Sequence, residues 1–319
     1  MKHWLKHLVV AGAVASLYPA APAVAADTEA LISPEAAVAP VTLQAEAEAE
    51  PDPARNITGF VGGAFTNAYI SRGAVQQNQG IIFQPYAELD FALFDNSEAQ
   101  GAFFKKSYAY LGIWNSLHSD HGPGTLAGWY EFDWYVGAAV DIAGGFNLNL
   151  QYVEFISPAN AFGTAKNVQL VVSYDDSELI GNISKDIPAL KPYAQIFFTT
   201  DGAAATGTGG GQYLEVGINP SITFGGENAT YPLTLTFPAA VGFGFDDFYA
   251  DDEAFGFGRV GISAGIPLAF MNQAGYGTWS LTGGVTVWIY GDGVADYNKT
   301  VAGDADYIVS GVLGAQCNF

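Results

Sequence analysis

The sequence has a single cysteine, Cys317, among its 319 residues. One cysteine cannot form an intramolecular disulfide, so the fold must be held together by other contacts. Basic residues are also scarce, because 11 Lys and Arg stand against 32 Asp and Glu, which gives a net charge of −21. Nucleic acid is bound largely through cationic side chains, so it is excluded as a partner.

Long apolar runs and histidines are scarce too. No run approaches the roughly 20 apolar residues of a transmembrane helix. Of the 4 histidines, only His118 and His121 lie beyond the N-terminal leader. A hydrolase of the membrane type needs a serine beside a histidine that an acid or amide orients. Two histidines in one Gly-Pro loop do not supply that arrangement, so we expect no enzyme and no cofactor.

The first 54 residues predict two segments that precede the folded domain. Residues 1–26 have a positive start, an apolar stretch and the small residues Ala23-Val24-Ala25, which is typical of a cleaved secretory signal. Residues 27–54 are rich in Ala, Glu and Pro and predict a disordered acidic tether in the periplasm. The folded domain is then expected at 55–319, which retains 25 acidic and 9 basic residues.

The last stretch, Asp306 to Phe319, alternates apolar residues with small or polar ones, and this period of two predicts a strand. It resembles the C-terminal strand of bacterial outer-membrane barrels, which ends in a phenylalanine that the assembly machinery reads. This resemblance implies that Gly314 and Phe319 belong to an assembly signal. A buried terminal strand of a soluble sandwich is the alternative.

The same alternation recurs along the folded domain in segments separated by Gly, Asp, Asn and Pro clusters. Many segments are long enough to cross a bilayer at a tilt. We therefore predict an all-β, transmembrane, antiparallel up-and-down β-barrel of about twelve strands. The expected strands lie near 57–71, 82–94, 106–116, 129–141, 146–151, 168–174, 193–200, 213–219, 233–241, 259–266, 279–290 and 306–319.

Charged residues recur on the face of these strands opposite the bulky apolar one. Because a charge facing lipid is unfavourable, these side chains are expected to face the lumen. The predicted pore-lining residues are Glu88, Asp90, Glu131, Asp133, Glu215 and Arg259. Rings of carboxylates favour cations, and Arg259 is positioned to pair with an acid across the lumen. The alternative is that the acids simply pack inside a narrow, plugged lumen.

With an even number of strands, the outward loops fall near 72–81, 117–128, 157–166, 201–212, 246–255 and 291–305. Arg72 is expected at an outward strand end, where it either braces the loop or contacts solute. His118, Asp120 and His121 offer too few ligands for a zinc site. The acids between Asp246 and Glu253 lack the ligand spacing of a calcium loop. We therefore predict no metal site and interpret both segments as solvated loops.

Several short motifs lie between about residues 60 and 180. They are Tyr69-x-x-Arg72-Gly73 followed by Gln76-Gln77, and then the segments 110–116, 131–137 and 152–158. In this order they resemble the TorF-like porin family of bacterial outer membranes. The resemblance implies an outer-membrane barrel that acts as a pore, without defining its solute. The chain departs from the family in its acidic tether and its longer second half.

The sequence thus predicts a porin-like channel of the bacterial outer membrane for passive diffusion of small hydrophilic solutes, with a preference for cations. Its expected partners are outer-membrane lipid, the barrel-assembly machinery and those solutes. The alternative function is a non-conducting barrel with a structural or surface-interaction role, which presents its acidic loops.

Overall fold

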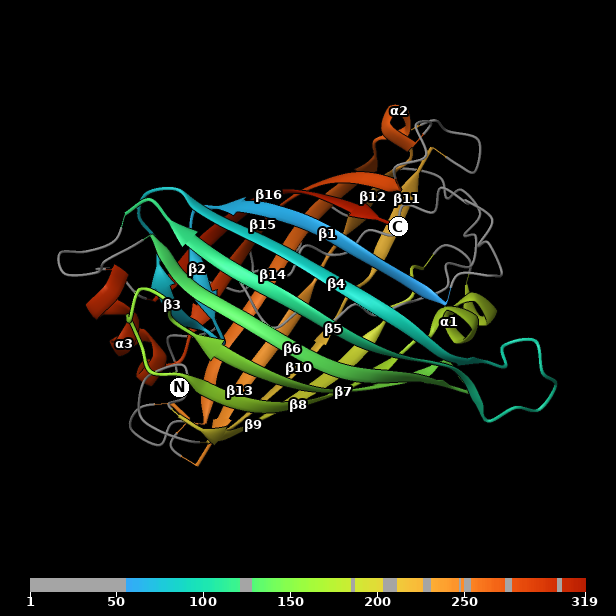
Figure 1. Cartoon of the computed structure of the whole chain (residues 1–319), viewed down its shortest axis with the longest axis horizontal. Coiled ribbons are helices and arrows are strands. Elements are labelled where there is room, and N and C mark those ends of the chain that lie inside the picture. The colour runs from blue at the N-terminus through green and yellow to red at the C-terminus, as the bar shows by residue number, and fades with distance from the viewer. Residues whose placement is uncertain are drawn as a thin grey trace.

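Antiparallel strands make up most of the described part of the chain (Figure 1). The computed structural model describes residues 56–120, 128–184, 187–202, 211–225, 231–246, 248–249, 254–272, 277–302 and 306–319. Within these ranges, twelve strands pair in a ring and close into a barrel. The predicted all-β, up-and-down barrel is therefore confirmed. The predicted signal (1–26) and tether (27–54) lie outside the described residues.

The barrel closes where its last strand pairs with its first. In wall order the strands are β1 (Ile57–Thr66), β4 (Ile82–Asp95), β5 (Phe104–His118), β6 (Trp129–Ile142), β7 (Phe146–Ile156), β8 (Ala165–Tyr174), β9 (Pro192–Asp201), β10 (Gln212–Ile218), β13 (Ala239–Phe245), β14 (Phe255–Pro267), β15 (Thr278–Tyr290) and β16 (Tyr307–Asn318). Backbone hydrogen bonds of 3.0 and 2.9 Å between Gly59 and Phe319 extend the β1–β16 seam to the last residue.

Two strands of the wall are interrupted by proline. β10 continues as β11 (Ser221–Phe224) beyond Pro220, and β12 (Leu233–Thr236) continues as β13 beyond Pro238. Proline has no N–H for the ladder and fixes its own φ angle, so each break allows the strand to bend. The single strand predicted at 233–241 is therefore two shorter strands, and the β11–β12 hairpin joins the wall through the pairing of β12 with β14.

The period of two separates an apolar outer face from a mixed inner face. Outward side chains such as Leu150, Val260 and Leu313 are 55–56% exposed. Their neighbours along the strands point inward and are buried, and many of these are Gln, Asn, Ser, Thr or Tyr. This distribution is the one expected where lipid contacts the outside of a barrel and polar groups fill the inside.

Glycines on the inner face lie beneath aromatic rings of the adjacent strand. A Cβ atom at Gly112 would come within 2.3 Å of the ring and hydroxyl of Tyr135, and one at Gly137 within 2.3 Å of the Tyr110 hydroxyl. The missing side chain therefore lets each tyrosine lie flat along the wall. Such aromatic–glycine pairs fix strand register and fill the lumen without pushing the strands apart.

Further elements lie at the two ends of the barrel (Figure 1). One end carries the short strands β2 (Tyr69–Ser71) and β3 (Ala74–Gln77) and the helix α3 (Asp292–Ala302), and we call it the α3 end. The other end carries α1 (Ser177–Ile183), α2 (Ala269–Asn272) and Phe319, and we call it the α1 end. None of the helices in the described part of the chain is long and apolar enough to span a membrane.

The first strand is shorter than the sequence predicts, because it ends at Thr66 rather than near residue 71. At Asn67 the chain leaves the wall, and the Asn67 side chain replaces the missing strand partner of β16. Its Oδ1 accepts a hydrogen bond from Gly311 N at 2.6 Å, and its Nδ2 donates to Val309 O at 3.3 Å. The following residues form the β2–β3 hairpin, and the predicted loop 291–305 contains α3.

Candidate functional site: the barrel lumen

All six ionisable residues predicted to line a pore lie on the inner face of the barrel. β4 carries Glu88 and Asp90, β6 carries Glu131 and Asp133, β10 carries Glu215, and β14 carries Arg259. Four of the acids are buried, whereas Asp90 and Arg259 are half-buried. The alternation of the sequence therefore predicted their direction correctly. Their role in conduction stays a prediction.

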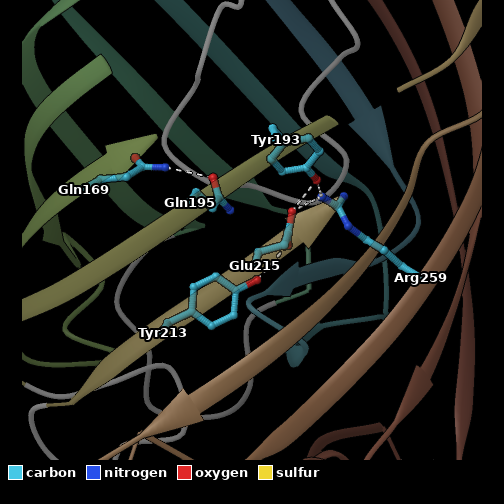
Figure 2. A network of polar contacts seen from close by, with 6 residues as sticks. All are labelled: Gln169, Tyr193, Gln195, Tyr213, Glu215 and Arg259. Carbon is cyan, nitrogen blue, oxygen red and sulfur yellow. Dashed lines mark hydrogen bonds and ion pairs between the residues drawn. The ribbon is translucent and has the colours of Figure 1, made fainter. Parts of the chain in front are cut away.

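Glu215 is the centre of a buried polar network (Figure 2). Its carboxylate accepts hydrogen bonds from the Tyr193 hydroxyl at 2.5 Å and the Tyr213 hydroxyl at 2.7 Å. Arg259 Nη2 donates to Glu215 Oε1 at 2.6 Å and to the Tyr193 hydroxyl at 3.1 Å. The Glu215 side chain is 0% exposed, so its charge is neutralised entirely by groups of the barrel itself.

The strand arrangement explains why Arg259 reaches this acid. β13 lies between β10 and β14, and at this level its inward residues are Ala240 and Gly242. Neither has a long side chain, so the guanidinium can extend over β13 toward Glu215. The sequence predicts a partner for Arg259 across the lumen, whereas the partner is two strands away along the same wall.

A chain of amides continues this polar surface around the barrel. Gln151 Nε2 donates to Gln169 Oε1 at 3.4 Å, and Gln169 Nε2 donates to Gln195 Oε1 at 3.0 Å (Figure 2 shows the second pair). At its other end, the Tyr110 hydroxyl donates to Asn149 at 2.6 Å. Pairing on β7, β8 and β9 places these side chains in adjacent rows. The ladder gives the inner wall polar but uncharged groups between its acids.

Glu131 and Asp133 form a second acidic cluster, at the α3 end of β6. The Tyr69 hydroxyl donates to Glu131 Oε2 at 2.7 Å. Arg72 interacts electrostatically with both acids. Its guanidinium lies 4.7 Å from the centre of the Phe155 ring and 4.2 Å from that of Phe197. A buried cation between two rings and two carboxylates is stabilised by both.

The predicted position of Arg72 at an outward strand end is wrong. Arg72 and Gly73 have positive φ angles of 47° and 86°, and they form the tight turn of the β2–β3 hairpin. This hairpin folds back into the barrel, so Arg72 is only 4% exposed. The sequence gives little indication of this hairpin turn, because Ser-Arg-Gly-Ala lacks the Asn-Gly or Asp-Gly pair that is typical of such turns.

His118 also lies elsewhere than the sequence predicts. It is the last residue of β5 and buried, its ring stacks on Tyr130, and its Nε2 is 2.8 Å from Ser116 Oγ. The contacts of this pair do not include the acid that would orient a catalytic imidazole. His121 lies outside the described residues. Among the residues that are described, no group of three or more His, Cys, Asp or Glu could hold a metal ion.

The α3 end is acidic. Its described acids include Asp120, Asp201, Asp246, Asp292, Asp296 and Asp306. Its described lysines are Lys166, 3.0 Å from Asp201, and Lys299, 2.6 Å from Asp296. The predicted acidic loop 246–255 is only partly solvated, because Phe248 and Tyr249 are buried, and residues 247 and 250–253 lie outside the described part.

Comparison with known proteins adds structural neighbours but no family. No protein-family model matches the chain, and no curated protein matches its sequence. The β domain of the Bordetella autotransporter BrkA is 13% identical, with 82% of this chain and 98% of that one covered and a TM-score of 0.41. The COG4313 outer-membrane channel of Pseudomonas putida F1 is 10% identical, with 82% of this chain and 94% of that one covered and a TM-score of 0.44. The NanC porin is 8% identical, with 81% of this chain and 98% of that one covered and a TM-score of 0.39. These values are too low to carry a functional conclusion.

Proposed function

We propose that the protein is a porin-like channel of the bacterial outer membrane, through which small hydrophilic solutes diffuse and cations pass preferentially. The outward apolar side chains and the length of the strands support insertion in a bilayer, and the barrel form satisfies the backbone without helices. The loops predicted to face outward, such as 72–81 and 291–305, lie at the α3 end. The α3 end is therefore placed at the cell exterior and the α1 end in the periplasm. The resemblance to the TorF-like porin family belongs to the same proposal.

The observation that carries the proposal is the distribution of charge along the lumen. Carboxylates of β4, β6 and β10 point inward, amides of β7, β8 and β9 lie along the wall between β6 and β10, and the α3 end bears further acids. An acidic entrance raises the local concentration of cations and lowers that of anions. Fixed carboxylates inside the barrel would extend that bias along the route of the solute.

The reversal potential of the refolded protein in a planar bilayer, under a KCl gradient, tests this proposal. The wild type should give the sign expected for a cation-preferring channel. The double variant E131Q/D133N should shift the reversal potential toward zero, because it replaces two carboxyl groups of the lumen with neutral amides and leaves the positive charge of Arg72 without its acidic partners. The matched control E98Q/E178Q removes two exposed acids at the α1 end, far from these charges, and should leave the reversal potential nearly unchanged. An anion-preferring wild type would refute the cation preference.

Assembly through the outer-membrane machinery is also part of the proposal. Phe319 is 46% exposed at the seam, and Gly314 packs against Ala64 of β1. The terminal strand therefore combines an accessible aromatic end with close pairing to β1. Deletion of Phe319 should lower the yield of heat-modifiable barrel in cells while leaving refolding in detergent largely intact. Unchanged yield in cells would refute the assembly signal.

A second function is favoured by the packing at the α3 end. Tyr69, Ile70, Ala74 and Val75 of the hairpin are at most 2% exposed, so this part of the lumen is filled. A barrel permanently filled in this way would be a structural or surface protein rather than a channel. Insertion into the bilayer without any conductance, by the wild type and by variants that loosen the hairpin, would establish this alternative.

A further inference from the structure

The β2–β3 hairpin is an insertion into the lumen and not part of the barrel wall. It forms a separate two-stranded sheet, and its residues Ile70, Ala74 and Val75 are 0–1% exposed. The chain enters it after Asn67 and leaves it at Gly80, whose φ angle is +71°. Because both ends of the hairpin lie at the α3 end, it can move as one unit without breaking the ladder of the wall.

A buried side chain of α3 binds the backbone of the hairpin turn. Asn298 is 0% exposed, its Oδ1 accepts from Val75 N at 2.8 Å, and its Nδ2 donates to Gly73 O at 3.0 Å. One amide therefore satisfies two backbone groups beside the hairpin turn. Tyr249 adds a third bond to the same turn, from its hydroxyl to Arg72 O at 2.8 Å. Buried backbone groups are strongly held by such partners.

Side-chain hydrogen bonds also join the hairpin to the wall. They include Tyr69 to Glu131 at 2.7 Å and Tyr130 to Gln76 at 3.0 Å. Arg72 adds side-chain contacts with the Phe155 and Phe197 rings and an electrostatic interaction with Glu131 and Asp133 of β6. The described contacts between hairpin and wall are thus made by side chains, whereas Asn298 and Tyr249 bind the backbone of the hairpin turn.

We infer that the hairpin and α3 form a gate, in which the hairpin fills the lumen and Asn298 is the positioning residue that latches it. This inference rests on the proposed channel function. In the closed arrangement, the amide of Asn298 holds the turn that carries Arg72 deep in the barrel. When α3 moves away, the turn loses two hydrogen bonds at once, and the hairpin can leave the lumen as a unit.

Cysteine accessibility tests the latch without relying on conductance. The probe is S71C, which places a thiol at a buried hairpin position close to the size of the original serine, in a background where Cys317 is replaced by alanine. The protein is refolded in vesicles and labelled with a charged methanethiosulfonate. Adding N298A should raise the labelling rate about 30-fold, the factor for two lost hydrogen bonds of about 1 kcal/mol each.

The control is T300A, on the same helix, because the Thr300 hydroxyl bonds only within α3, to Tyr297 O, and is exposed. It should leave the labelling rate of S71C unchanged. Equal labelling in N298A and T300A would overturn the latch. Fast labelling of S71C in the otherwise unaltered barrel would overturn the closed gate. Faster labelling in N298A with no conductance in any variant would instead reject the channel function and leave the moving hairpin established.

Discussion

Removal of the Glu215 carboxylate should destabilise the barrel more than any single surface change. In E215A, the hydroxyls of Tyr193 and Tyr213 lose their acceptor, and the guanidinium of Arg259 loses its counter-ion at 2.6 Å. Breaking a buried ion pair by removing one partner costs about 3–5 kcal/mol, because a charge stays buried without compensation. We expect E215A to lower the free energy of unfolding by that amount.

E215Q removes the negative charge of residue 215 while keeping a side chain of nearly the same size and shape. Glutamine retains one acceptor oxygen for the tyrosines but cannot neutralise Arg259. Because the charge of Arg259 stays uncompensated, as in E215A, we expect a loss near the lower end of the same range, about 3 kcal/mol. Urea titration of the refolded protein, followed by tryptophan fluorescence and by gel mobility without heating, measures both variants on one scale.

A double-mutant cycle with R259A measures the pair itself. We expect a coupling of about 1–3 kcal/mol, as for other residues in one buried network. The matched control is the pair Lys166 and Asp201 at 3.0 Å, whose side chains are 41% and 65% exposed. An exposed pair should couple by less than about 1 kcal/mol. Equal coupling in the two pairs would refute the buried network as a stabilising centre.

Three further changes test the wall. G112V should destabilise by about 1–3 kcal/mol, because the added carbons meet the Tyr135 ring; full stability would show that the ring can move, and Y135A should rescue the variant. L150R places a charge in the middle of the lipid-facing side of β7 and should cost about 2–4 kcal/mol in vesicles; equal unfolding of L150R and wild type would contradict the assigned outer face. N67A should cost about 1–3 kcal/mol through the two backbone groups of β16 that lose their partner, and an unchanged urea midpoint would refute that role.

The strands of the wall could be predicted from the sequence because lipid imposes one simple pattern on all of them. The predicted strands 82–94 and 129–141 agree with β4 (Ile82–Asp95) and β6 (Trp129–Ile142) to within a residue or two. The alternation also predicted the direction of the inward acids. A strand has only two faces, and a charged side chain is unfavourable on the face that contacts lipid. Burial of one face makes the register of such strands strongly specified.

The hairpin and α3 could not be predicted in the same way. Their places are set by contacts such as the bond between Asn298 and Gly73, which are 225 residues apart. A periodic pattern within one segment cannot predict a contact between distant segments. The segments 72–81 and 291–305 are also rich in polar and small residues, as ordinary loops are. The partner of Arg259 could not be predicted for the same reason. Glu215 lies 44 residues away in the sequence, and several other acids also point inward.

Single-channel recording of two proteins in planar bilayers tests whether the barrel is a cation-preferring channel that the hairpin closes. One is the refolded wild type, and the other has residues 68–80 replaced by a short Gly-Ser turn, so that the hairpin is absent. We expect brief openings in the wild type and long-lived, cation-selective openings in the hairpin-free barrel. Insertion of both proteins with no conductance from either would contradict the channel function.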